Sequence, residues 1–372
     1  MKRSEIEKEL LAWMSESVWH KDDARFERLA LALFRFQYDH CEPYARLCRA
    51  LGRTPSEARR FADIPAVPTG AFKEFDLCSF DLSSCIKTFQ TSGTSTDRRG
   101  RLHLDTLKLY EASLLSSLRR NFLRDLCGKR PCLRFLAPNL EEAPDSSLSH
   151  MFETLRIAEG GPESAFDLID GQLNLEALRE AVRVAGEGAS PILLLGTSFA
   201  FVHFLDAVVD SPARDWRLPA GSRLMETGGF KGRSREVPAE ALRGDLARRF
   251  SIPETSIINQ YGMTELGSQF YDSTLLDQSG PRRKLAPPWT RVRIIDPMSG
   301  QDVSPGEDGM IVIHDLANTG SVAAIQTADL GRLVPVASDV DAGFSIVGRF
   351  DGAEERGCSI ATDIMLETSG RA

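Results

Sequence analysis

Hydrophobic and polar positions follow two different periods along the chain. Residues 1 to about 60 show the helical period, and Leu29, Leu33 and Phe36 contribute to a broad apolar face there. Helical patterns recur at 106–123, 175–184 and 199–208. Short apolar runs that are typical of buried strands occur at 86–89, 131–136, 191–195, 222–225 and 257–260. The pattern therefore predicts helices that alternate with strands.

The predicted strands end in turns that are rich in glycine, serine and threonine. This alternation is typical of an α/β fold with largely parallel sheets, in which ligands bind beyond the carboxyl ends of the strands. From residue 291 onward the runs become short and rich in strand patterns. We predict a helical N-terminal region at 1–85, an α/β core at 86–290, a small β subdomain at 291–349 and a short tail at 350–372.

The charge balance argues against two classes of partner. The chain has 45 basic and 53 acidic residues, whereas nucleic acids and anionic membranes bind concentrated basic surfaces. The sequence has no apolar run of membrane-spanning length, and its charged start lacks a secretory apolar region. The seven cysteines are irregularly spaced and include no Cys-x-x-Cys pair, which argues against structural zinc and a disulfide framework. These features predict a cytoplasmic protein with reduced thiols.

The first turn with suitable chemistry for phosphate follows the run at 86–89. Hydroxyl groups, backbone N–H groups and a glycine can together surround phosphate oxygens. The glycine and lysine spacing of a P-loop is absent, and a stretch of this composition can also be an ordinary turn. The residues of this predicted phosphate loop are Thr91, Ser92, Gly93, Thr94, Ser95 and Thr96.

Three further turns could complete a nucleotide site. Thr264 and Glu265 place a hydroxyl beside a carboxylate that could bind Mg²⁺, although an acid at a helix start is the alternative. A pair of glycines would let a flat ring lie against the backbone, or would form a plain turn. A carboxylate and a guanidinium could bind ribose hydroxyls, or could form a surface ion pair. These residues are Gly228, Gly229, Asp329 and Arg349.

In this order the turns resemble those of the adenylate-forming superfamily, which includes acyl-CoA synthetases, peptide-synthetase adenylation domains and luciferases. The superfamily's Tyr-Gly-x-Thr-Glu motif matches Tyr261, Gly262, Thr264 and Glu265. The resemblance implies that Thr264 contacts phosphate and that Glu265 binds Mg²⁺. It also implies ATP as a cofactor and a carboxylic acid as substrate. The other implied positions are the phosphate loop at 91–96, an acyl-pocket motif at 196–203 gated by His203, the adenine platform at Gly228 and Gly229, and ribose contacts from Asp329 and Arg349.

A narrower resemblance, over most of the chain, is to LuxE-type acyl-protein synthetases. It depends on the stretches at 145–150, 225–233 and 356–359. The resemblance implies that the acyl group passes from acyl-AMP to Cys358, and then to a partner such as an acyl reductase or an acyl-carrier protein. Arg356 would favour the thiolate form of this cysteine, whereas a buried and inert thiol is the alternative.

The end of the chain departs from the superfamily pattern. The mobile C-terminal domain of the superfamily is reduced or absent, and so is its catalytic lysine, because the last lysine of this chain is Lys284. Lys231 or Arg233 could supply the missing positive charge, or both could be ordinary surface charges. His203 could contact the carboxylate or simply pack within its helix.

The predicted function is ATP-dependent activation of a carboxylic acid, with a fatty acid favoured, and transfer of the acyl group to a protein cysteine. Two alternatives remain open. One is an enzyme that adenylates an aromatic or other small acid in natural-product biosynthesis, in which Cys358 would have no role. The other is a non-catalytic nucleotide-binding subunit of a reductase complex.

Overall fold

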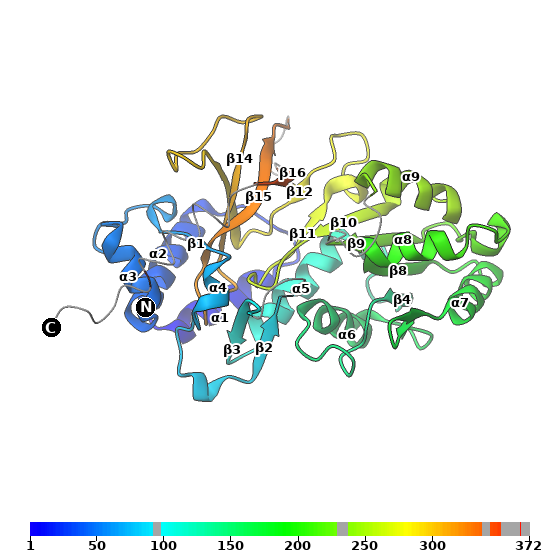
Figure 1. The fold of residues 1–372 in the computed structure, drawn as a ribbon, viewed down its shortest axis with the longest axis horizontal. Helices are drawn as coiled ribbons and strands as arrows, with labels where there is room; N and C mark the ends of the chain where they lie inside the picture. Colours follow the sequence, from blue (N-terminus) through cyan, green and yellow to red (C-terminus); the bar gives the residue numbers. More distant parts are fainter. Residues whose placement is uncertain (92–97, 229–236, 337–342, 351–364, 366–372) are drawn as a thin grey trace. The chain divides into compact units, whose positions relative to one another are not determined.

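The chain forms two compact units, each assembled from segments that are far apart in sequence. A computed structural model describes residues 1–91, 98–228, 237–336, 343–350 and 365 (Figure 1). The first unit comprises Met1–Ser116, Met263–Phe270 and Arg283–Ala372, and the second comprises Ser117–Gly262 and Tyr271–Arg282. The division into four consecutive segments that the sequence suggests stays a prediction.

The helices of the first unit come from its N-terminal part, where the helical period of the sequence is confirmed. Phe26, Leu29 and Leu33 are buried at helical spacing, and the Asp22 carboxylate caps their helix by accepting from the backbone N–H of Arg25 at 2.8 Å. No helix among the described residues is both long and apolar enough to cross a bilayer. The helices are α1 (Arg3–Met14), α2 (Asp23–His40), α3 (Glu42–Ala50), α4 (Ala71–Glu74) and α5 (Lys108–Asn121), the last of which ends in the second unit.

The strands of the first unit pair mostly in antiparallel fashion. β14 lies between β13 and β15, β16 pairs with β15 and β12, and β1 joins β15 in parallel. β2 and β3 form a separate pair in which Gln90 lies opposite Arg101, so the chain returns to Gly100 beside Thr91. The strands are β1 (Val67–Pro68), β2 (Lys87–Gln90), β3 (Arg101–Leu104), β12 (Lys284–Leu285), β13 (Thr290–Ile295), β14 (Asp308–Asp315), β15 (Ala324–Val334) and β16 (Gly343–Arg349).

The second unit contains the parallel sheet that the sequence predicts. Parallel neighbours run in the order β5, β4, β8, β9 and β10. These are β4 (Cys132–Leu136), β5 (Ala165–Phe166), β8 (Ile192–Thr197), β9 (Arg223–Thr227) and β10 (Ile257–Tyr261). The remaining strands are the antiparallel pair β6 (Leu168–Ile169) and β7 (Gln172–Leu173), and β11 (Phe270–Asp272), which begins in the first unit.

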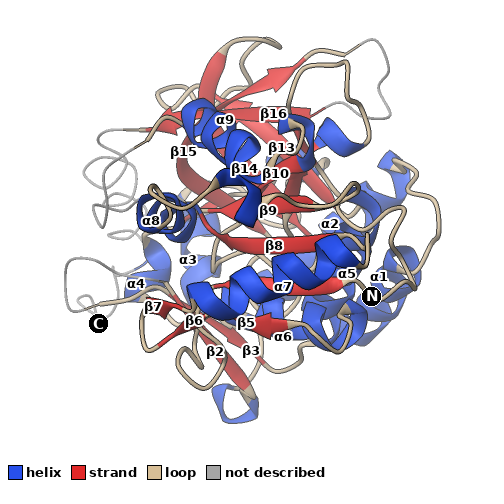
Figure 2. Cartoon of the chain, turned by 90° about the vertical axis from the view of Figure 1, so that its right-hand side faces the viewer, coloured by secondary structure: helices blue, strands red, loops and turns tan. Residues whose placement is uncertain are grey.

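Helices cover both faces of this parallel sheet, which explains why β8 reads as an almost continuous apolar run. On one face, Leu194 of β8 belongs to the same core cluster as Phe201 and Leu246. On the other, the rings of Phe135 and Phe152 lie with centroids 5.1 Å apart. The helices are α6 (Ser147–Glu159), α7 (Leu175–Glu187), α8 (Ser198–Ala207) and α9 (Ala239–Phe250), and Figure 2 shows α7 to α9 with the strands they cover.

His314 of β14 is a buried titratable group in the first unit. Its ring meets the Phe61 ring edge-on, with centroids 5.1 Å apart, and its side chain is 1% exposed. Burial, helped by the charge of Arg293, lowers the pKa of His314 from the ordinary 6.5 to about 3. The native state therefore keeps a neutral imidazole under conditions in which the unfolded chain binds a proton.

We predict that His314 makes the protein less stable in acid. Its native pKa lies below its unfolded value, so its contribution to stability is complete above pH 6.5 and is lost as the pH falls toward about 3. The free energy of unfolding should fall by about 1.4 kcal/mol per pH unit from this residue. Urea unfolding between pH 4 and pH 7 should show a shallower acid loss for His314→Leu than for wild type. The exposed His40→Leu variant is the control, and parallel pH curves for wild type and His314→Leu would contradict the prediction.

Candidate functional site

The second unit brings the ends of three predicted strands to one edge of its sheet. β8, β9 and β10 are parallel and in register, with Thr197 and Gln260 each opposite Thr227. The residues that follow these strands must therefore gather beyond the same edge. Ser198 and Gly228 follow β8 and β9, and Tyr261 is the last residue of β10. Gly228 and Tyr261 belong to turns that the sequence assigns to the nucleotide.

A buried carboxylate connects these strand ends. Glu226 of β9 is 3% exposed and accepts hydrogen bonds from the Ser198 hydroxyl and, at 2.8 Å, from Nδ2 of Asn259. The Ser198 hydroxyl also lies 3.0 Å from the carbonyl oxygen of Gly228. Gly228 has a positive φ of 76°, a conformation that favours glycine. The network thus fixes the turn that carries the predicted adenine platform.

Glu226 and Asn259 were missed as site residues by the sequence reasoning. A signal was present, because a carboxylate at the end of a buried apolar strand requires partners inside the protein. Which groups would supply those partners could not be read from local spacing, since Asn259 lies 33 residues away along the chain.

The first unit brings the start of the predicted phosphate loop to the predicted Mg²⁺ ligand. The backbone N–H of Gly100 donates to the Thr91 hydroxyl at 2.9 Å, and the N–H of Thr91 donates to the carbonyl of Gly100 at 2.9 Å. A methyl group added to Gly100 would lie 3.1 Å from Cγ2 of Thr91 and 3.4 Å from Oε1 of Glu265. Glu265 is 6% exposed, and its carboxylate therefore lies beside Gly100. The Thr264 hydroxyl lies 3.5 Å from the carbonyl oxygen of Gln90, at the end of β2.

The two predicted ribose-binding residues are cross-strand neighbours in the first unit. Asp329 of β15 lies opposite Arg349 of β16, and Nε of Arg349 is 3.6 Å from Oδ1 of Asp329. The arginine side chain is 74% exposed, so its remaining donors are accessible. The pairing is compatible with both the ion pair and the ribose site that the sequence suggests.

The remaining predicted residues differ in what the structure says of them. His203 lies on α8 with an exposed side chain, its ring parallel to that of Phe199 at a centroid distance of 6.4 Å. Its proposed contact with the carboxylate stays a prediction. Tyr261 and Gly262 are half-buried at the end of β10. Outside the described residues lie Ser92, Gly93, Thr94, Ser95, Thr96, Gly229, Lys231, Arg233 and Cys358.

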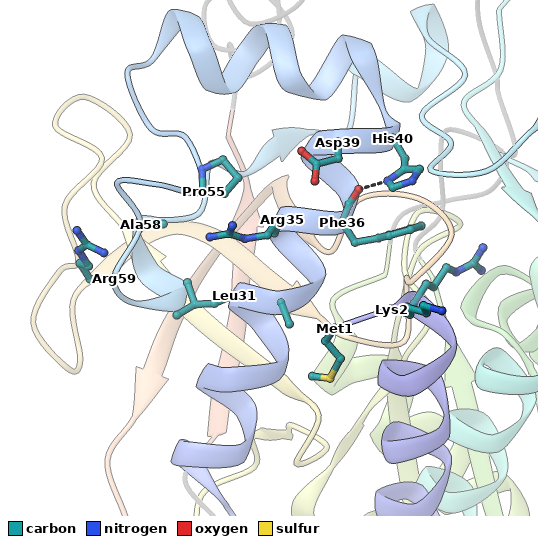
Figure 3. Close-up of a pocket in the computed structure, with 12 residues that line it drawn as sticks. Met1, Lys2, Leu31, Arg35, Phe36, Asp39, His40, Pro55, Ala58 and Arg59 are labelled. Carbon is teal, nitrogen blue, oxygen red and sulfur yellow. Dashed lines mark hydrogen bonds between the residues drawn. The ribbon is translucent and has the colours of Figure 1, made fainter.

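A cavity of about 570 Å³ lies elsewhere in the first unit (Figure 3). Leu31, Arg35 and Phe36 of α2 line it, together with residues at the start of α1 and Pro55 and others after α3. None of the lining residues belongs to the predicted nucleotide site, so this cavity is separate from the chemistry considered above.

The described residues contain no group of three or more His, Cys, Asp or Glu side chains placed to hold a metal ion. This finding does not conflict with a Mg²⁺ site, because proteins commonly bind Mg²⁺ through one or two carboxylates together with substrate phosphates. Glu265, beside the start of a hydroxyl-rich loop, fits that mode of binding.

The chain has a mixed α/β fold that is shared with a solved acyl-CoA ligase. It is similar to 2-hydroxyisobutyryl-CoA ligase in an open conformation in complex with 2-HIB-AMP and CoA, with a TM-score of 0.63 and 16% identity over 90% of this chain and 77% of that one. The thioesterification state of the same ligase gives a TM-score of 0.61 and 17% identity over 94% and 69% of the two chains. The mixed α/β fold predicted from the sequence is thereby confirmed.

The chain belongs to the LuxE acyl-protein synthetase family, whose model matches residues 152–366. The predicted family and the predicted ligase class are therefore confirmed. Two relatives are long-chain-fatty-acid–luciferin-component ligases. The one from Vibrio harveyi is 21% identical over 82% of this chain and 78% of its own length, and the one from Aliivibrio fischeri is 22% identical over 92% and 88%. The family match includes Glu226, Glu265 and Cys358, and begins after the predicted phosphate loop.

We predict that the Ser198 hydroxyl contributes substantially to stability. Ser198→Ala removes a donor from the buried Glu226 carboxylate, which should lower the free energy of unfolding by roughly 1–3 kcal/mol. Ser190→Ala is the matched control, because the exposed Ser190 hydroxyl bonds only to a nearby backbone carbonyl at 3.3 Å, and surface changes of this kind usually cost under about 0.5 kcal/mol. Urea unfolding measures both, and equal losses would argue against a special role for the strand-end network.

Proposed function

We infer that this chain uses ATP and Mg²⁺ to activate a fatty acid as an acyl-adenylate and then transfers the acyl group to its own Cys358. The observation that carries this proposal is the contact between the Glu265 side chain and the turn of Thr91 and Gly100, within a member of the LuxE family. A carboxylate and a hydroxyl-rich loop are the groups that a metal-bound triphosphate requires.

The phosphate end of ATP is assigned to the first unit. The loop at 91–96 would surround phosphate oxygens with N–H and O–H donors, the Thr264 hydroxyl would add another donor, and Glu265 would hold Mg²⁺. When bound, Mg²⁺ would offset the negative charge that develops on the phosphate oxygens. The described geometry supports this assignment because side-chain atoms of Glu265 and Thr91 both lie close to Gly100.

The recognition of the adenosine part is assigned by motif. Gly228 and Gly229 would present a backbone surface to the flat adenine ring, with Tyr261 and Gly262 beside them at the same edge of the sheet. Asp329 would accept hydrogen bonds from ribose hydroxyls, and Arg349 would donate. Support comes from the Glu226 network, which holds the Gly228 turn in one arrangement.

The reaction has two balanced steps. A carboxylate oxygen of the acid attacks the α-phosphorus of ATP, an oxygen–phosphorus bond forms, and pyrophosphate leaves. The Cys358 thiolate then attacks the acyl carbon, a thioester forms, and AMP leaves with the oxygen that the acid supplied. Lys231 or Arg233 would take the charge-stabilising role of the superfamily lysine in the first step. His203 would contact the carboxylate as the acid binds.

The long-chain fatty acid is the substrate class that we favour. The names of both relatives state a long-chain fatty acid as substrate, and their similarity covers most of this chain. After transfer, the thioester on Cys358 would deliver the acyl group to a second protein, such as an acyl reductase or an acyl-carrier protein.

We predict that Cys358→Ser abolishes acyl transfer but leaves adenylate formation intact, because the thiol acts only in the second step. Wild-type protein incubated with ATP, Mg²⁺ and palmitate should gain the mass of one palmitic acid less one water, and hydroxylamine should remove the adduct. Intact-mass spectrometry of Cys358→Ser should show no such adduct, while acid-dependent pyrophosphate exchange continues.

Cys127→Ser provides the control for this experiment, since Cys127 is an exposed free cysteine among the described residues. It should retain the full adduct. A hydroxylamine-labile adduct of undiminished amount on Cys358→Ser would refute the assignment of the acceptor, and its loss in Cys127→Ser would move the acceptor to that residue.

A further inference from the structure

Hydrogen bonds connect the loop that carries Glu265 to the end of β14 and the turn that follows it. Nδ2 of Asn318 donates to the backbone carbonyl of Glu265 itself at 2.7 Å. Three residues further along the loop, the Ser268 hydroxyl donates to Oδ1 of Asp315 at 2.7 Å. The backbone N–H of Ala317 donates to the same Oδ1 atom at 3.0 Å. Residues 265–268 are thus bound to the turn at both ends.

The contact between loop and turn leaves no room for a side chain at Gly267. A methyl group at this position would lie 2.9 Å from Cβ of Ala317 and 3.0 Å from Oδ1 of Asn318, closer than such contacts normally come. The backbone of the loop therefore packs directly on the turn. This close approach explains why glycine occupies position 267 although its φ is not positive.

The turn is itself held by other parts of the first unit. Nε2 of Gln37 on α2 donates to the carbonyl of Asn318 at 2.7 Å, and Oε1 of Gln37 accepts from the N–H of Ala323 at 3.0 Å. On the loop side, Nε1 of Trp289 donates to Ser268 Oγ at 3.1 Å and to Ser113 Oγ at 3.0 Å. The loop is connected in this way to α2, to α5 and to the start of β13.

Every side chain of this arrangement is removed from water. Asp315 is fully buried, and Asn318 and Ser268 are each 1% exposed. Burial raises the pKa of Asp315 to about 6, although the Ser268 hydroxyl and backbone N–H groups lower it in part. Burying an ionisable group lowers the stability of the fold unless hydrogen bonds compensate for the lost hydration.

We propose that Asp315 and Asn318 are positioning residues that fix the Glu265 carboxylate and thereby set the Mg²⁺ requirement of adenylate formation. This inference rests on the proposed function. The bonded atom is the carbonyl oxygen of Glu265, one residue beyond Thr264, so a shift of the loop moves the metal ligand and the phosphate donor together. Loss of a residue that hydrogen-bonds to a metal ligand typically lowers metal affinity by about 10-fold to 100-fold.

The test compares Asn318→Ala with a matched variant, Asn121→Ala. Both asparagines are 1% exposed, each donates through Nδ2 to a backbone carbonyl, and in each the Oδ1 atom has no partner within the described part of the chain. Asn121 bonds to the Ser117 carbonyl on its own helix, away in sequence from the Glu265 loop. The two changes should therefore cost similar stability but differ in their effect on the metal.

The measurement is acid-dependent pyrophosphate exchange in the full-length chain as Mg²⁺ is titrated. Asn318→Ala should raise the Mg²⁺ concentration for half-maximal exchange by about tenfold or more, whereas Asn121→Ala should leave it at the wild-type value. Asp315→Asn should behave as a conservative variant, because an amide oxygen can still accept the bonds that Oδ1 accepts, and Oδ2 has no partner within the described residues.

Ser268→Ala keeps the test decisive if Asn318→Ala does not fold. Trp289 would retain Ser113 as acceptor, so this variant should fold and show a severalfold higher Mg²⁺ requirement. An unchanged requirement in either folded variant, or an equal rise in Asn121→Ala, overturns the positioning role. Absence of exchange in wild-type protein contradicts the proposed function itself, so the two failures are distinct.

Discussion

The structure depends on one constraint: a polar group taken out of water must find its hydrogen-bond partners inside the protein. One instance lies at the end of β14 and in the turn after it, where Oδ1 of Asp315 accepts from the Ser268 hydroxyl and Nδ2 of Asn318 donates to the Glu265 carbonyl. Few conformations of the loop allow the buried carboxylate and the buried amide to keep these hydrogen bonds. These hydrogen bonds hold the loop of Glu265 against the turn.

The same constraint operates at the parallel sheet of the second unit. Buried apolar residues open β8 and β10 and form the middle of β9, and polar residues follow toward the carboxyl ends of β9 and β10. There Glu226 binds Ser198 and Asn259. Each unit thus places its polar chemistry in turns that a buried carboxylate stabilises from within the protein. The LuxE family match includes both Glu226 and Glu265.

Much of the fold could be predicted because its signals are local. The run at 191–195 and the Gly-Thr-Ser turn after it predict a buried strand and its carboxyl end, and β8 and the start of α8 occupy those positions. Candidate site residues could be named from the sequence only where a residue belongs to a short motif, as Glu265 does. Asn318 and Glu265 are 53 residues apart, and Asp315 and Ser268 are 47 apart, so their bonds depend on strand pairing that no local period encodes. The exposure of His203 likewise follows from packing rather than from spacing.

The central claim is that a carboxylate of the substrate attacks the α-phosphorus of ATP, and isotope transfer tests it most directly. Wild-type protein would be incubated with ATP, Mg²⁺ and palmitate carrying ¹⁸O in both carboxylate oxygens, and the AMP would be analysed by mass spectrometry. The account predicts that each AMP released on acyl transfer carries one ¹⁸O atom in its phosphate. AMP without the label, or label found in orthophosphate beside ADP, would contradict it.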